Sequence, residues 1–189
     1  MRIAAGRTGE PEVLLLKPGT IRRDRSGRII DASSSVTLIV AGETRLVVDT
    51  ARPGDAGEIL QALRTISISP EQVTSLVNTH SHPDHCGNNH LFSRAARLRD
   101  GDDVAPGVWI MATPGHTTDS ISVVVEAMER VVVAGDALPT YGNFLKRVPP
   151  AIHIDRAQAV LSMERILELA DLVVPGHDRP FHTAKRRYL

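Results

Sequence analysis

Four of the eight histidines in this chain lie between residues 80 and 90. In an extended segment, residues two apart project to the same side, so His80 and His82 can offer their imidazoles to one point. Asp84 and His85 follow directly and, after a turn at Pro83, could reach a second point. Imidazoles with carboxylates and no thiolates suit zinc, iron or manganese in sites that keep a position open for water. The segment therefore indicates a metal site whose other ligands come from elsewhere in the chain.

Three more candidate ligands stand where apolar runs give way to loops, and each directly follows a glycine. A glycine there would let the backbone turn sharply while the preceding strand fixes the height of the side chain. Because strand ends converge at one edge of a sheet, these residues can join the histidine-rich segment at one place. The candidate metal ligands are His80, His82, Asp84, His85, His116, Asp136 and His177.

Val- and Ile-rich runs bounded by turn signals predict the elements that position these side chains. We expect strands at 13–16, 36–40, 45–49, 75–78, 108–112, 121–125, 131–134 and 172–174, with hairpin connections at 41–43 and 127–129. Apolar spacing and capping residues predict helices at 55–65 and 155–170, and a short capped helix after Ser69. The stretch 92–95 is interpreted as the approach to a strand, and 99–102 as a turn.

The two halves of the chain repeat one pattern, which indicates an internal duplication. In each half an apolar strand, a tight connection and a second strand lead to an aspartate, Asp49 or Asp136. A helix and a further strand follow, and that strand ends near His80 in one half and His177 in the other. Continuous apolar strands are buried on both faces, so we expect an α/β fold with two sheets inside and helices outside.

The ordered motifs identify the chain as similar to the metallo-β-lactamase superfamily over essentially its whole length. Residues 79–85 match the HxHxDH motif of that family, and Asp49, His116, Asp136 and His177 match its other motifs in order. The resemblance implies a four-layer αββα sandwich that holds two metal ions. It further implies the roles of the residues. The first metal ion would be bound by His80, His82 and His116, the second by Asp84, His85 and His177, with Asp136 bridging and Asp49 a buried support for the metal-binding loop.

Two cations that share a carboxylate and a water molecule would generate a hydroxide at neutral pH. We expect two divalent ions, zinc before iron or manganese, and hydrolysis of a small-molecule ester-type bond such as a thioester or a lactone. The leaving group would take its proton from water or from Asp84. Glyoxalase II-like thioesterases and lactonases resemble the chain in these motifs. The alternatives are phosphodiester or RNA cleavage by the same two ions, and persulfide oxidation at a single iron.

Composition restricts the partners of such an enzyme. The 22 basic and 22 acidic residues give a net charge of zero, which makes nucleic acid an unlikely partner. The sequence shows neither a membrane span nor a signal peptide, so we expect a cytoplasmic protein that acts on a small molecule. The oligomeric state is left open, a homodimer included. The single cysteine, Cys86, is interpreted as a packed thiol, and His90, His153 and His182 as ordinary surface or core residues.

Length and core content indicate a single domain over residues 1–189. One feature departs from the family pattern. The connection from His85 to His116 is short, and a strand and helix pair would normally lie there. We therefore expect a segment near residues 94–97 to be either deleted or absent from the sequence.

Overall fold

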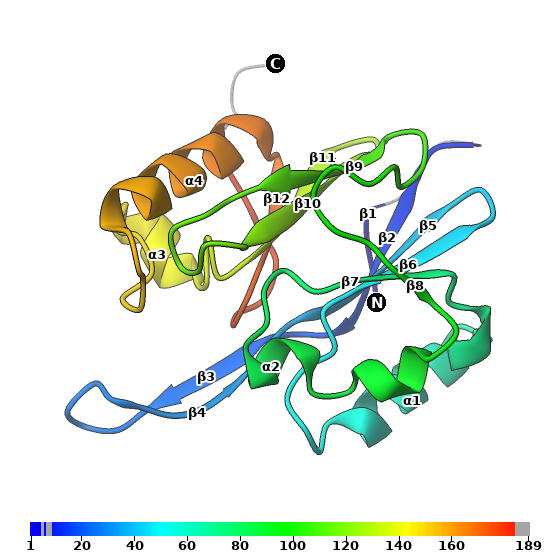
Figure 1. Cartoon of the computed structure of the whole chain (residues 1–189), viewed down its shortest axis with the longest axis horizontal. Helices are drawn as coiled ribbons and strands as arrows, with labels where there is room; N and C mark the ends of the chain where they lie inside the picture. The colour runs from blue at the N-terminus through cyan, green and yellow to red at the C-terminus, as the bar shows by residue number, and fades with distance from the viewer. Residues whose placement is uncertain (5, 7–8, 184–189) are drawn as a thin grey trace.

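The computed structural model describes residues 1–4, 6 and 9–183. Two β-sheets make up the centre of this part of the chain (Figure 1). The first sheet contains, in spatial order, β1 (Arg2–Ala4), β2 (Glu12–Lys17), β5 (Val36–Ala41), β6 (Thr44–Val48), β7 (Ser75–Val77) and β8 (Ala96–Arg97). The second contains β13 (Phe181–His182), β12 (Leu172–Pro175), β11 (Arg130–Gly135), β10 (Ile121–Glu126) and β9 (Val108–Ala112).

Helices cover the outer face of each sheet (Figure 1). Beside the first sheet lie α1 (Ala56–Thr65), α2 (Pro83–Cys86) and two 3₁₀ turns, Pro70–Gln72 and Asn89–Phe92. Beside the second sheet lie α3 (Tyr141–Lys146) and α4 (Arg156–Leu169). The layers therefore run helix, sheet, sheet, helix, which confirms the predicted four-layer αββα sandwich.

Apolar side chains fill the three spaces between these layers. Val48 and Val123 belong to the cluster between the two sheets, where both are completely buried. Ile59 of α1 packs in the cluster outside the first sheet, and Ile166 of α4 in the cluster outside the second. Burial on both faces of each sheet is the reason why the central strands have continuous rather than alternating apolar sequences.

The two halves have the same topology, as the sequence repeat predicted. In the first half, β5 and β6 form an antiparallel hairpin, α1 crosses over, and β7 returns parallel to β6 with Val48 paired to Val77. In the second half, β10 and β11 form the hairpin, α4 crosses over, and β12 returns parallel to β11 with Val133 paired to Val174. Parallel strands after each crossover end at the same edge, and this places the residues that follow β7 and β12 near each other.

The predicted capping residues have the expected contacts. Asp155 precedes α4, and its side chain accepts a hydrogen bond from the Gln158 amide at 3.0 Å. The Gln72 side chain accepts from the Ser69 amide at 2.8 Å, although the capped segment is a 3₁₀ turn. No helix in the described residues combines the length and the apolar character needed to cross a bilayer.

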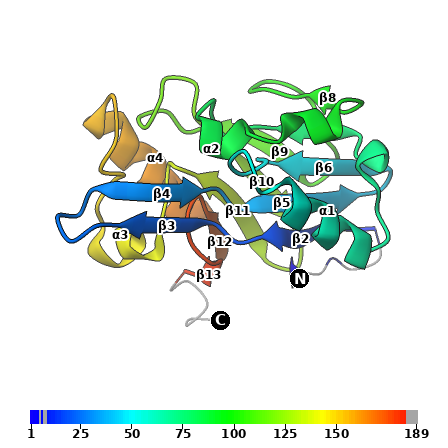
Figure 2. The ribbon, with the colours of Figure 1, turned by 90° about the horizontal axis from the view of Figure 1, so that it is seen from below.

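The stretch 92–95 leads into a strand as predicted: Phe92 ends a 3₁₀ turn and is buried against the α1 cluster, and the two-residue β8 begins at Ala96. Several short elements were not predicted from the sequence, among them β1, α3 and β13. A ribbon of β3 (Thr20–Arg23) and β4 (Ile29–Ser33), which the sequence analysis did not predict, extends beyond the ends of the sheets (Figure 2). β3 is largely exposed and β4 is mostly half-buried, so the two strands lack the apolar alternation that marks a buried strand.

Candidate metal centre

The histidine-rich segment leaves the end of β7 and turns at once into α2. His82 has extended backbone angles and precedes α2, and Pro83 occupies the first helical position, where its missing N–H is not needed. This start places His80 and His82 on the extended part and Asp84 and His85 on the first turn of the helix. The predicted change of direction at Pro83 is therefore present.

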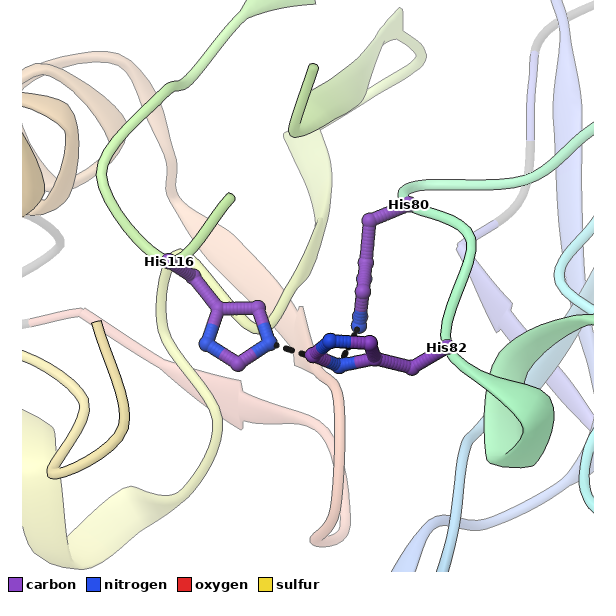
Figure 3. A group of neighbouring side chains, drawn as sticks. All are labelled: His80, His82 and His116. Carbon is purple, nitrogen blue, oxygen red and sulfur yellow. Dashed lines mark hydrogen bonds between the residues drawn. The ribbon is translucent and has the colours of Figure 1, made fainter. Parts of the chain in front are cut away.

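Three imidazoles from two segments form the first group of candidate ligands (Figure 3). His82 Nδ1 lies 3.0 Å from His80 Nε2 and 3.1 Å from His116 Nε2. His116 reaches this position from the loop that follows β9. The three rings meet edge to face, with centroids 4.5 to 4.8 Å apart. Their nitrogens could hold one metal ion.

A second group lies beside the first and combines Asp84, His85 and His177. His85 Nε2 lies 3.4 Å from His177 Nε2, and that same nitrogen of His177 lies 3.6 Å from Asp84 Oδ2. His177 arrives from the loop after β12, on the other sheet from the segment that carries His85. The duplication thus brings together side chains that are far apart in the sequence.

Asp136 lies between the two groups. Its Oδ2 is 3.5 Å from His116 Nε2 of the first group. Its Oδ1 is 3.1 Å from His177 Nε2 and 3.5 Å from His85 Nε2 of the second group. One carboxylate thus presents one oxygen to each side, the arrangement that a bridging ligand requires. All seven predicted ligand side chains lie in this one cluster.

The glycines before three of these side chains act in two different ways. Gly115 and Gly135 have positive φ angles of 130° and 51°, which β-carbon-bearing residues rarely adopt, so they allow the predicted sharp turns. Gly176 is not among the residues with positive φ, and its role is steric. A β-carbon built on Gly176 would lie 2.1 Å from Asp136 Oδ1. The missing side chain of Gly176 therefore makes room for the central carboxylate.

Hydrogen bonds at the outer ring nitrogens fix the tautomers of three histidines. His116 Nδ1 donates to the Ile152 carbonyl at 2.7 Å, and His177 Nδ1 donates to the Ser33 carbonyl at 3.1 Å. His85 Nδ1 donates to Asp49 at 2.8 Å. In a neutral imidazole only one nitrogen carries hydrogen, so in the neutral form each of these rings would turn an Nε2 lone pair toward the cluster.

Burial favours the neutral form of two histidines of the first group, His80 and His82. Burial of the imidazole, followed by the nearby His85, lowers the pKa of His80 to about 2. Burial and the neighbouring His116 also lower the pKa of His82. A neutral imidazole is the form that binds a metal ion, so these two side chains can bind a metal cation without first losing a proton.

Carboxylates reverse the effect of burial on the other side of the cluster. Burial disfavours the charged form of His85, but Asp49 and Asp136 outweigh it and hold the pKa of His85 well above its usual range. Burial likewise opposes a charged His177, and Asp136 raises the pKa of that ring. Although burial by itself would raise the pKa of Asp136, His85 and His177 hold it well below its usual range. The region around Asp136 therefore stabilises positive charge.

The donor set fits divalent cations. Asp136 Oδ1 is buried and has no hydrogen-bond partner of acceptable geometry, although His177 Nε2 is near. A buried carboxylate oxygen without a hydrogen-bond donor is costly unless a positive charge lies beside it. Imidazole nitrogens and carboxylate oxygens are ligands that zinc, iron and manganese accept. The residues present thus match the metal-binding capacity predicted from the sequence.

Asp49 lies outside the cluster and holds the loop that carries it. This buried carboxylate accepts hydrogen bonds from the Thr79 amide at 2.7 Å and the Thr79 hydroxyl at 2.8 Å, as well as from His85. Asp49 thus orients one candidate ligand and fixes the backbone beside another. Such contacts are those expected of a residue that supports ligands without binding metal.

Sequence reasoning missed a run of three buried serines, Ser33 to Ser35, that joins the two halves at the site. The Ser33 carbonyl accepts from His177, and the Ser34 amide donates to the Asp84 carbonyl at 2.9 Å. The Ser35 amide donates to the Gly176 carbonyl at 2.8 Å. Three polar residues directly before an apolar strand were a signal that could have drawn attention to this segment.

The remaining histidines and the cysteine stand apart from the cluster. None of His90, His153 and His182 belongs to a potential metal-binding group within the described part of the chain. His153 Nδ1 instead donates to the Pro150 carbonyl at 2.7 Å. Cys86 is partly buried, and its thiol lies 3.2 Å from the His82 carbonyl. These positions agree with the interpretation of the three histidines as ordinary surface or core residues and of Cys86 as a packed thiol, here beside the cluster.

A cavity of about 540 Å³ borders the histidine-rich loop. Its lining includes His80, Ser81 and Cys86 from the loop and Arg97 and Arg99 from the region of β8. The cavity has the size of a small-molecule site.

Comparisons with known proteins agree with this geometry. The family model of the metallo-beta-lactamase superfamily matches residues 30–101. Metallo-beta-lactamase domain-containing protein 1 of Xenopus laevis is 35% identical to this chain, over 88% of this chain and 80% of that protein. The N-acyl homoserine lactonase of Bacillus cereus is 29% identical, over 64% of this chain and 62% of that enzyme. A solved structure from Thermotoga maritima has the same fold, with a TM-score of 0.74, 21% identity and coverage of 92% of this chain and 99% of that one.

The sequence identity with the Xenopus protein extends over most of both chains. Together with the matched family model and the shared fold, it identifies the type of protein. The chain belongs to the metallo-β-lactamase superfamily of hydrolases.

Proposed function

We propose that this chain hydrolyses a small-molecule ester-type bond, a lactone or a thioester, and that it uses two divalent metal ions, for which we propose zinc. The observation that carries the proposal is the position of Asp136, one oxygen of which faces each group of candidate ligands. A site for a single ion would not need a buried carboxylate between two sets of imidazoles.

In this proposal the residues divide as follows. The first ion is held by His80, His82 and His116, and the second by Asp84, His85 and His177, with Asp136 shared between them. Asp49 holds the His85 ring in place through its hydrogen bond to Nδ1. Two ions at these positions would lower the pKa of a coordinated water molecule toward neutrality and polarise a carbonyl oxygen.

Asp84 is the residue we assign to proton transfer. Its side chain is 26% exposed, whereas the Asp136 side chain is 12% exposed and the His85 side chain is fully buried. A group that returns a proton to a leaving alkoxide or thiolate must lie at the open side of the site. Asp84 combines that position with a distance of 3.6 Å from its carboxylate to His177 Nε2.

The choice of an ester-type substrate rests on two observations. The Bacillus cereus relative is named as a lactonase, and the net charge of this chain is zero. A balanced charge favours a small molecule over a polyanion such as RNA. The cavity beside His80 and Ser81 provides space for an organic substrate next to the histidine-rich loop.

Metal analysis and hydrolysis assays test the proposal. We expect the purified protein to bind two zinc ions per chain and to cleave a lactone or a thioester rather than bis(4-nitrophenyl) phosphate. His82→Ala and Asp136→Ala should lose turnover and bind less metal, whereas the matched control His182→Ala should do neither. Cleavage confined to the phosphate diester would replace the proposed substrate class. Full activity of both cluster variants would refute the site.

A further inference from the structure

An ion pair between Lys17 and Asp55 lies almost completely out of contact with solvent beside the proposed site. Lys17 ends β2, and its side chain is 5% exposed. Its Nζ lies 3.4 Å from Asp55 Oδ2 and donates to Ser33 Oγ at 3.0 Å and to the Pro18 carbonyl at 3.2 Å. The three protons of the ammonium group thus have three acceptors, and the geometry of the lysine is fixed.

Asp55 occupies the N-cap position of α1 but does not cap that helix with its side chain. Its carboxylate instead accepts from the Ser33 hydroxyl at 2.6 Å and from Arg52 Nε at 3.2 Å. A capping bond stabilises a helix by about 1 kcal/mol, so the structure forgoes that contribution in favour of Lys17 and Ser33.

Ser33 is where this polar network reaches the metal centre. Its hydroxyl is held from both sides, because it donates to Asp55 and accepts from Lys17. Its carbonyl accepts the hydrogen of His177 Nδ1 at 3.1 Å. Because a carbonyl oxygen can only accept, this bond requires hydrogen on Nδ1 and leaves the Nε2 lone pair directed at the candidate ligands.

Stability alone does not account for the buried ion pair. Replacing such a pair by apolar side chains is often neutral or stabilising, because both charges lose their hydration. The ion pair is also connected to only one of the two groups of candidate ligands. The serine run that it anchors contacts His177 and the backbone of Asp84, both of the second group.

We propose that Lys17 and Asp55 are positioning residues for the second metal position, and that they act through Ser33 on the orientation and tautomer of His177. The inference rests on the proposed function, because it assumes that His177 binds metal. Neither residue touches the substrate or a reacting atom. Their effect is confined to the group formed by Asp84, His85 and His177.

The test is zinc titration of the metal-free protein with Lys17→Met, which keeps most of the side-chain length and removes the charge. The two binding steps are assigned with His82→Ala and His177→Ala, each of which should remove one step. Loss of partners behind a ligand typically weakens metal binding 10- to 100-fold, and we expect Lys17→Met to weaken the His177 step about tenfold. The His82 step should be unchanged.

A second readout needs no metal. Nitrogen NMR of the metal-free wild type, recorded at a pH above the raised pKa of His177 so that the ring is neutral, should show hydrogen on Nδ1, and Lys17→Met should give a mixture of tautomers. The control is Arg2→Met, which removes an exposed ion pair with Glu12 and should change neither measurement. If Lys17→Met does not fold, the double variant Lys17→Met/Asp55→Asn removes both buried charges and should give the same two results.

The outcomes separate this inference from the proposed function. An unchanged His177 step with an unchanged tautomer, or equal weakening of both steps, would overturn the positioning role. A wild type that binds no zinc would overturn the metal centre and this inference together. Two intact binding steps without hydrolysis of any ester-type substrate would overturn the proposed reaction and leave the positioning role supported.

Discussion

Gly176 offers a sharp test of how closely the cluster is packed. In Gly176→Ala the new β-carbon would lie 2.1 Å from Asp136 Oδ1, and 3.1 Å from the carbonyl carbon and oxygen of Gly135. Carbon and oxygen normally approach to about 3.3 Å, so the carboxylate or the end of β12 must move by roughly 1 Å. Overpacking of this kind costs about 1–3 kcal/mol. A displacement of about 1 Å at a catalytic centre can lower turnover about 100-fold.

The assay compares Gly176→Ala with Gly57→Ala. A β-carbon at Gly57, on the exposed face of α1, would meet no atom within 4 Å. That control should stabilise the protein by about 0.4–1 kcal/mol, because alanine has less backbone freedom than glycine in the unfolded chain. Urea unfolding of the metal-free proteins gives the stability cost, and hydrolysis assays of the zinc-loaded proteins give the turnover. If Gly176→Ala unfolds and turns over substrate like the wild type, the close contact with Asp136 is not real.

Three further predictions follow from the same contacts. In Asp49→Asn the asparagine can adopt the positive φ of 58°, but its amide N–H group would face groups that are themselves hydrogen-bond donors. The free energy of unfolding should therefore fall by about 1–3 kcal/mol in urea titrations. An unchanged midpoint would contradict the role of Asp49. Removal of metal by a chelator should lower the thermal midpoint, because zinc at about 100 times its Kd adds about 2.7 kcal/mol, and readdition should restore it. Burial opposes the charged form of Asp55, but hydrogen bonds from Ser33 and Arg52, with Lys17 beside them, lower its pKa. Because the pKa of Asp55 is lower in the folded protein than the unfolded value of 3.8, the ionised carboxylate stabilises the fold above that value, and this stabilisation is lost as the pH falls through the folded pKa. In urea unfolding between about pH 5 and about pH 3, the free energy of unfolding of the wild type should therefore fall more than that of Asp55→Asn.

The architecture was predictable because its signals are local and repeated. Continuous apolar runs mark strands buried on both faces, and the repeat of hairpin, helix and strand fixes the layer order. The seven clustered side chains were predictable for a related reason. Each stands at the end of a strand or in the segment that directly follows one, and such ends meet at one edge of the sheets.

The polar network behind His177 was not predictable, because it depends on contacts between residues distant in sequence. Lys17, Ser33 and Asp55 carry no periodic signal, and each is an ordinary surface residue type. The 3₁₀ turn that ends at Phe92 was not predictable either, because one buried aromatic side chain fits a strand and a 3₁₀ turn equally well, although the segment 92–95 does lead into β8. The deleted or absent segment near 94–97 stays a prediction, which the intact mass of the protein would test against 20.5 kDa.

The duplication also explains how one sequence pattern yields two different roles. Asp49 follows β6 and Asp136 follows β11, at matching places in the two halves. The carboxylate of Asp49 is satisfied by three protein donors, from Thr79 and His85. One oxygen of Asp136 is buried without such a donor.

A carboxylate already saturated by protein N–H and O–H groups has no lone pair directed at a cation, whereas an unsaturated buried one requires positive charge. The number of protein donors, rather than the residue type or its place in the repeat, therefore decides which aspartate supports the site and which is free to bind metal. On this reasoning, exchange of roles between Asp49 and Asp136 would require moving the donors of Thr79 and His85 as well as the carboxylates.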